Sequence, residues 1–194
     1  YKRKFKFSKE EIKIGIFSGI FLFAFCALQT IGLNNTTVAS AALYTGTAAL
    51  MTPFVALAIS RRKIEVMELV AGVLLLVALY INNDGNFTNV NLGDILVISS
   101  AFMLALNASI LGKYLRKLHV STVTFISFIT CSLMGLVVDV AQGSGFYIPN
   151  SFEEILMFLF IGAIATALAF VIQNFGIEII GESDVSFVLG SESI

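Results

Sequence analysis

The feature that most constrains the fold is a succession of apolar segments, each long enough to cross a lipid bilayer. A spanning helix needs about 20 mostly apolar residues, and about 17 to 25 are tolerated. The segments that meet this length are residues 14–33, 38–59, 64–81, 95–111, 120–138 and 155–177, and a seventh begins near Ser183. Only 13% of the residues are charged, whereas a soluble domain carries about 25%. The sequence therefore predicts an all-α, polytopic transmembrane helical bundle.

Basic residues occur only in every second connection between these segments. The 12 Lys and Arg residues fall at 2–13, 61–63 and 113–117, and the connections 34–37, 82–94 and 142–154 contain none. Such clusters mark the cytoplasmic side of a membrane protein. We therefore expect an integral protein of a bacterial plasma membrane with its basic loops in the cytoplasm.

The third apolar segment is the weakest of the six, because Glu65 and Glu68 lie in its first turn. Without it, the second and third basic clusters would lie on opposite sides of the membrane, against the positive-inside pattern. We keep it as a short transmembrane helix. A re-entrant or interfacial helix is the alternative.

The chain also matches itself weakly at a separation of 144 residues. The matched pairs are Glu10/Glu154, Gln29/Gln173, Gly32/Gly176, Gly46/Gly190 and Thr47/Ser191. This separation spans five helices, an odd number, so the second copy would cross the membrane in the opposite direction. Inverted repeats of this kind are an architecture of secondary transporters, and their substrate site lies where the repeats meet.

Several stretches resemble the drug/metabolite transporter superfamily, EamA type. Residues 26–43, CALQTIGLNNTTVASAAL, followed by Pro53, are similar to the third and fourth helices of that family. Residues 162–170, GAIATALAF, with Gln173, are similar to its eighth helix. Gly93 and Asp94, which precede a Ser- and Ala-rich helix, resemble the start of its second repeat.

The resemblance implies a ten-helix fold of two inverted five-helix repeats. Residues 1–91 would be the end of the first repeat, helices three to five, and residues 92–194 the start of the second, helices six to part of nine. The chain would then be cut at both ends. The implied activity is transport of small organic metabolites such as amino acids or drugs, with export as the favoured direction. A small-molecule substrate and the lipid bilayer are the expected partners, and a homodimer is left open.

Polar side chains inside the spans are the candidate binding residues, because hydrocarbon offers them no other partners. They recur at helical spacing in four groups: Phe25 with Gln29; Ser40, Tyr44, Thr47 and Met51; Ser100, Met103 and Asn107; and Thr166, Phe170 and Gln173. From these groups we expect a central substrate cavity lined by Gln29, Tyr44, Thr47, Asn107, Thr166 and Gln173. Aromatic and amide groups suit a neutral or zwitterionic ligand. The alternative is that these side chains only join helices, each hydrogen bond contributing about 0.6 to 2 kcal/mol.

Other classes of function find less support in the sequence. The single histidine, His119, lies in a basic connection, and no span holds a Ser/His pair, paired aspartates or a set of metal ligands. We therefore expect no catalytic residue, metal ligand or cofactor, although a membrane-embedded enzyme remains a minor alternative. A non-transporting subunit or receptor is the main alternative. A channel would need rings of charged or carbonyl groups. The basic clusters are too short to favour nucleic-acid binding.

Glu192 is the one acidic residue that the sequence places deep in a predicted span.

Overall fold

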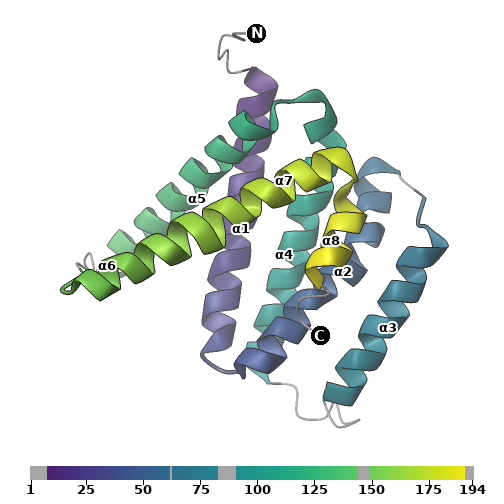
Figure 1. The fold of residues 1–194 in the computed structure, drawn as a ribbon, viewed down its shortest axis with the longest axis horizontal. Coiled ribbons are helices and arrows are strands. Elements are labelled where there is room, and N and C mark those ends of the chain that lie inside the picture. The colour runs from purple at the N-terminus through teal and green to yellow at the C-terminus, as the bar shows by residue number, and fades with distance from the viewer. Residues whose placement is uncertain (1–7, 62, 83–90, 144–148, 191–194) are drawn as a thin grey trace.

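The chain forms a bundle of helices in a computed structural model, which describes residues 8–61, 63–82, 91–143 and 149–190 (Figure 1). All the regular elements in these ranges are helical. They are α1 (Lys9–Leu33), α2 (Val38–Ser60), α3 (Val66–Asn82), α4 (Leu92–Tyr114), η1 (Leu115–Lys117), α5 (Val120–Gln142), α6 (Phe152–Leu159), η2 (Phe160–Leu168), α7 (Ala169–Ile179) and α8 (Glu182–Gly190). The elements α6, η2 and α7 form one continuous helix whose middle part, η2, is a π-helix.

Five helices in the described ranges are long and apolar enough to cross a membrane, counting α6 to α7 as one. They confirm the predicted transmembrane bundle for five of the six segments. The third segment does form a helix, α3, and the part of it that the structure describes has 17 residues, at the lower limit of the length that spans a bilayer. It is not among the five, and its crossing of the membrane stays a prediction.

Local hydrogen bonds set several of the helix boundaries. Ser8 caps the start of α1 by accepting a hydrogen bond from the Glu10 amide, and the Glu11 carboxylate accepts one from the Ser8 amide at 2.9 Å. Asn91 and Asp94 form the same reciprocal arrangement at the start of α4. Such caps satisfy amide groups that have no partner within the helix.

The helices alternate in direction, so the connections gather at two ends of the bundle. In Figure 1 the start of α1, the α2–α3 connection and the α4–α5 connection lie at the upper end. These are the three basic regions of the sequence. Hydrogen bonds join them: His119 Nδ1 lies 2.8 Å from Glu11 Oε1, the His119 amide donates to the same oxygen at 3.1 Å, and Lys113 Nζ donates to the Ile59 carbonyl at 2.9 Å.

Beneath this end lies a buried apolar cluster, here called the packed end. It draws on α1, α4, η1, α5, α7 and α8, and consists of Ile14, Ala108, Leu111, Leu115, Val120, Val123, Ile177 and Val185. Close packing of apolar side chains such as these holds membrane helices together through van der Waals contacts. The packed end therefore closes one side of the bundle.

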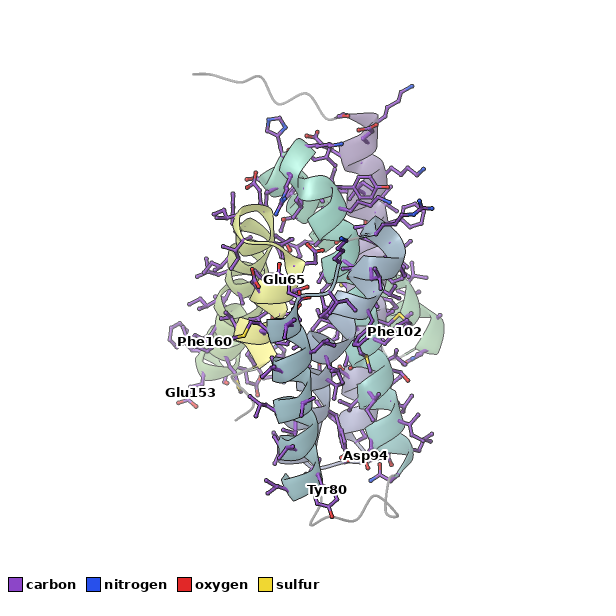
Figure 2. The ribbon with its side chains drawn as sticks, turned by 90° about the vertical axis from the view of Figure 1, so that its right-hand side faces the viewer. Glu65, Tyr80, Asp94, Phe102, Glu153 and Phe160 are labelled. Atoms are coloured by element: carbon purple, nitrogen blue, oxygen red, sulfur yellow. The ribbon has the colours of Figure 1, made fainter. Side chains whose placement is uncertain are left out.

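The outer surface of the bundle is also apolar. Phe102 and Phe160 point away from it (Figure 2), and Leu74, Phe125 and Leu156 are each more than half exposed. A water-soluble protein rarely shows apolar surface of this extent. Because lipid solvates such side chains, the surface is that of an integral membrane protein.

Candidate substrate cavity

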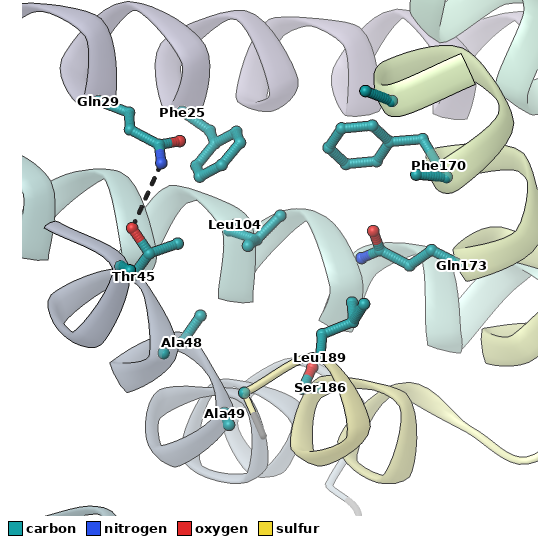
Figure 3. Close-up of a pocket in the computed structure, with 15 residues that line it drawn as sticks. Phe25, Gln29, Thr45, Ala48, Ala49, Leu104, Phe170, Gln173, Ser186 and Leu189 are labelled. Carbon is teal, nitrogen blue, oxygen red and sulfur yellow. Dashed lines mark hydrogen bonds between the residues drawn. The ribbon is translucent and has the colours of Figure 1, made fainter. Parts of the chain in front are cut away.

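A cavity of about 490 Å³ lies between α1, α2, α4, the η2–α7 segment and α8 (Figure 3). Most of its wall is apolar or formed by small residues. The lining residues are Phe25, Gln29, Ala42, Thr45, Gly46, Ala48, Ala49, Leu104, Ala165, Ala169, Phe170, Gln173, Ser186, Leu189 and Gly190. None of them carries a charge. This size and composition are typical of sites for small organic ligands.

The polar groups of the cavity are two amides and two hydroxyls. Gln29 Nε2 donates to Thr45 Oγ1 at 3.4 Å, which turns the Gln29 amide across the gap between α1 and α2. Gln173 lies on the opposite wall, and Ser186 lies on the α8 side (Figure 3). Amides both donate and accept hydrogen bonds. The cavity can therefore orient an uncharged polar group at two separate points.

Of the six predicted site residues, the structure brings Gln29 and Gln173 together around this cavity. The other four lie elsewhere. Thr166 belongs to the π-helix η2 but does not line the cavity. Asn107 is buried and accepts a hydrogen bond from Ser18 Oγ at 2.7 Å, so it joins α4 to α1.

The remaining two residues, Tyr44 and Thr47, lie on a different face of α2. Thr47 Oγ1 donates to the Tyr44 carbonyl of its own helix. Tyr44 lines a second, polar pocket of about 500 Å³ beside Asp94, among the caps of α1, α2 and α4. Glu192 lies outside the described residues.

The cavity face of α2 is formed by Ala42, Thr45, Gly46, Ala48 and Ala49, and its centre lies about half a turn from the polar stripe that the sequence suggested. The reason is steric. A Cβ atom on Gly190 of α8 would lie 3.0 Å from Ala49 Cβ and 3.5 Å from the Gly46 carbonyl oxygen. Small residues let the two helices approach at the cavity, and the spacing of Ala42 and Gly46, four residues apart, is a sequence signal typical of such a contact. Nothing in the sequence singled out Thr45 or Ser186.

The two sides of the cavity are built from matching positions in the sequence. Five pairs of lining residues are separated by 144 residues: Phe25/Ala169, Gln29/Gln173, Ala42/Ser186, Thr45/Leu189 and Gly46/Gly190. The starts of α2 and α8, Val38 and Glu182, have the same separation. In Figure 1, α1 and α8 run downward, whereas α2 and the helix from α6 to α7 run upward. Matching segments thus run in opposite directions.

Comparison with known proteins gives one result. A family model described as the EamA-like transporter family matches residues 1–83 and 91–194. Searches of curated proteins and of solved structures found no match.

Proposed function

Because the chain belongs to the EamA-like transporter family, a family of membrane transporters, we propose that it moves small organic metabolites across the membrane as an alternating-access carrier. Amino acids and uncharged drugs are the proposed substrates, and export is the proposed direction. The proposed substrate site is the cavity between α1, α2, α7 and α8.

The observation that carries this proposal is the pairing of the cavity residues. Gln29 on α1 and Gln173 on α7 lie on opposite walls at equivalent positions of two segments that run in opposite directions. A site between inverted repeats is the arrangement that lets a carrier expose one site to either side of the membrane in turn. This supports a ten-helix fold in which residues 1–91 belong to the first repeat and residues 92–194 to the second.

The packing of the bundle supports one particular state of the proposed cycle. The packed end closes the side where the basic regions lie, and the cavity extends from mid-bundle toward Gln29 near the opposite end of α1. If the basic regions are cytoplasmic, as the positive-inside rule favours, this state is closed to the cytoplasm. In an exporter it would be the state that releases substrate.

The lining indicates the kind of substrate. A charged ligand in a cavity without an opposite charge would lose its hydration without compensation. Apolar walls with two amides instead suit a molecule with no net charge, either neutral or zwitterionic, that carries an apolar group. Leucine, phenylalanine and uridine have these properties, whereas glutamate and choline do not.

The test is counterflow in proteoliposomes that contain the full-length protein, with labelled leucine, phenylalanine, uridine, glutamate and choline. We expect saturable exchange of one or more of the three molecules without net charge, and none of glutamate or choline. Exchange of only the charged solutes would contradict the substrate class. Absence of exchange across a wider panel of uncharged solutes, with correctly folded protein, would favour a non-transporting subunit.

A further inference from the structure

A pair of hydroxyl groups connects the cavity to the interior of the bundle. Ser186 on α8 lines the cavity, and its Oγ lies 3.1 Å from Oγ1 of Thr52 on α2. Thr52 is fully buried, and it is not among the residues that line the cavity. Ser186 can therefore contact both a molecule in the cavity and a residue beneath the cavity wall.

The hydrogen bonds around this pair compete for protons. Thr52 Oγ1 lies 2.7 Å from the Ala48 carbonyl oxygen, and Ser186 Oγ lies 2.7 Å from the Glu182 carbonyl oxygen. Together with the contact between the two hydroxyls, three hydrogen-bond contacts share two protons, because each hydroxyl donates only once. If both hydroxyls donate within their own helices, no proton remains to join α2 to α8. If Ser186 donates to Thr52, the helices are joined and the Glu182 carbonyl loses its side-chain donor.

The next residue of α2, Pro53, makes this contact sensitive to bending. Proline has no amide proton, so the Ala49 carbonyl lacks its usual donor within the helix, and a helix bends readily at such a position. Ala49 itself lines the cavity. The carbonyl of Thr52, the residue before Pro53, accepts a hydrogen bond of 3.4 Å from Ser109 Oγ of α4. The hydroxyl pair thus holds α8 against the point where α2 bends most easily.

We propose that Ser186 and Thr52 form a latch that keeps the packed end closed, and that a substrate which takes the hydrogen bond of Ser186 releases it. Val185, the neighbour of Ser186, belongs to the packed end, so a shift of α8 at the latch moves a residue of that cluster. Ser186 acts as a positioning residue for the closed state. The role of the latch in transport rests on the proposed function, whereas its mechanical role does not.

The mechanical role can be tested by thiol labelling at the packed end. Val123 is fully buried there, so the reporter is Val123→Cys in full-length protein whose Cys26 and Cys131 are replaced by Ser. The rate of reaction with N-ethylmaleimide then measures how often the packed end opens. We expect Ser186→Ala and Thr52→Val each to raise this rate about fivefold, the effect of losing one buried hydrogen bond. The double variant should react no faster than either single variant, because both changes remove the same contact.

Two variants serve as controls. Thr52→Ser keeps the hydroxyl and should react at the parent rate. Ser100→Ala removes a fully buried hydroxyl of α4 that donates to Val97 of its own helix, at 2.7 Å, and it should also leave the rate unchanged. Parent-like rates in Ser186→Ala and Thr52→Val would overturn the latch. So would additive effects in the double variant, or an equal increase in Ser100→Ala.

The role in transport has a separate readout. With L-leucine as the counterflow probe, Ser186→Ala should raise the half-saturating concentration, because Ser186 faces the cavity. Thr52→Val should change the maximal rate and leave that concentration unchanged. If leucine shows no counterflow even in the parent protein, the proposed function loses support, and the labelling rates still decide whether the latch exists.

Discussion

At the scale of single residues, two amides illustrate the two uses of a polar side chain inside a membrane. Asn107 is 2% exposed and bonded to Ser18, whereas Gln173 is half-buried and faces the cavity. Sequence reasoning placed both in the same class, because each lies on a predicted span at helical spacing from other polar groups. Only the packing separates the residue that joins helices from the residue that is available to a ligand.

The substitution Asn107→Ala should therefore affect stability and leave transport affinity unchanged. It removes the acceptor of the Ser18 hydroxyl, and the expected loss in the free energy of unfolding is about 1 to 2 kcal/mol. Thermal unfolding in detergent measures this loss, and counterflow measures the half-saturating concentration. A raised half-saturating concentration with unchanged stability would instead place Asn107 in the substrate site.

At the scale of helices, the contact between α1 and α5 depends on glycine. A Cβ atom on Gly19 would lie 2.5 Å from Thr130 Cβ and 2.6 Å from the Ser127 carbonyl oxygen. Ser127 Oγ also donates to the Gly15 carbonyl at 3.1 Å. The two backbones lie so close that no side chain fits between them, as in other membrane helix pairs with small residues at the interface.

Gly19→Ala should destabilise the protein by about 1 to 3 kcal/mol, because one methyl group forces α1 and α5 apart. Gly162 in η2 offers a matched control, since a Cβ atom there meets nothing within 4 Å. Thermal unfolding of the two variants, measured side by side, should show a clear loss for Gly19→Ala and none for Gly162→Ala. Because alanine favours a helix over glycine, helix propensity cannot explain a loss, and an equal loss in both variants would mean that the close contact with α5 is not its cause.

Helix positions were largely predictable from the sequence, and helix faces were not. The predicted segments 38–59 and 120–138 each begin at the first residue of the observed helix, because long apolar runs and polar turns identify a spanning helix directly. The cavity face of α2 was missed, because polarity suggested Tyr44 and Thr47 whereas α8 approaches α2 with Gly190 beside Ala49 and the Gly46 carbonyl. The sequence also did not indicate the π-helix η2, because its apolar residues fit an α-helix equally well.

At the scale of the whole molecule, the separation of 144 residues connects sequence and structure. The weak sequence matches reappear in the lining of one cavity: Gln29 and Gln173 lie on opposite walls, and Gly46 and Gly190 lie where α2 and α8 meet. Five lining residues, Phe25, Gln29, Ala42, Thr45 and Gly46, have partners at this separation that also line the cavity.

The orientation of the bundle has its own test. Single cysteines at Lys63 and Lys117 should react with an impermeant thiol reagent only from the cytoplasmic side, and a cysteine at Asn35 only from the outside. The reason is that Lys63 and Lys117 belong to the basic regions, and Asn35 to a connection without Lys or Arg. Labelling in intact cells and in inverted vesicles distinguishes the sides. Reaction of all three positions from one side would rule out the alternating arrangement.

The most direct test of the central claim, that two opposed segments supply equivalent residues to one substrate site, is the half-saturating concentration for counterflow in Gln29→Leu and Gln173→Leu. Each substitution removes one orienting amide and keeps the volume of the side chain. We predict an increase of about tenfold in both variants, in proportion to one hydrogen bond to the substrate, with thermal stability close to that of the parent protein. An unchanged value in either variant would contradict the account.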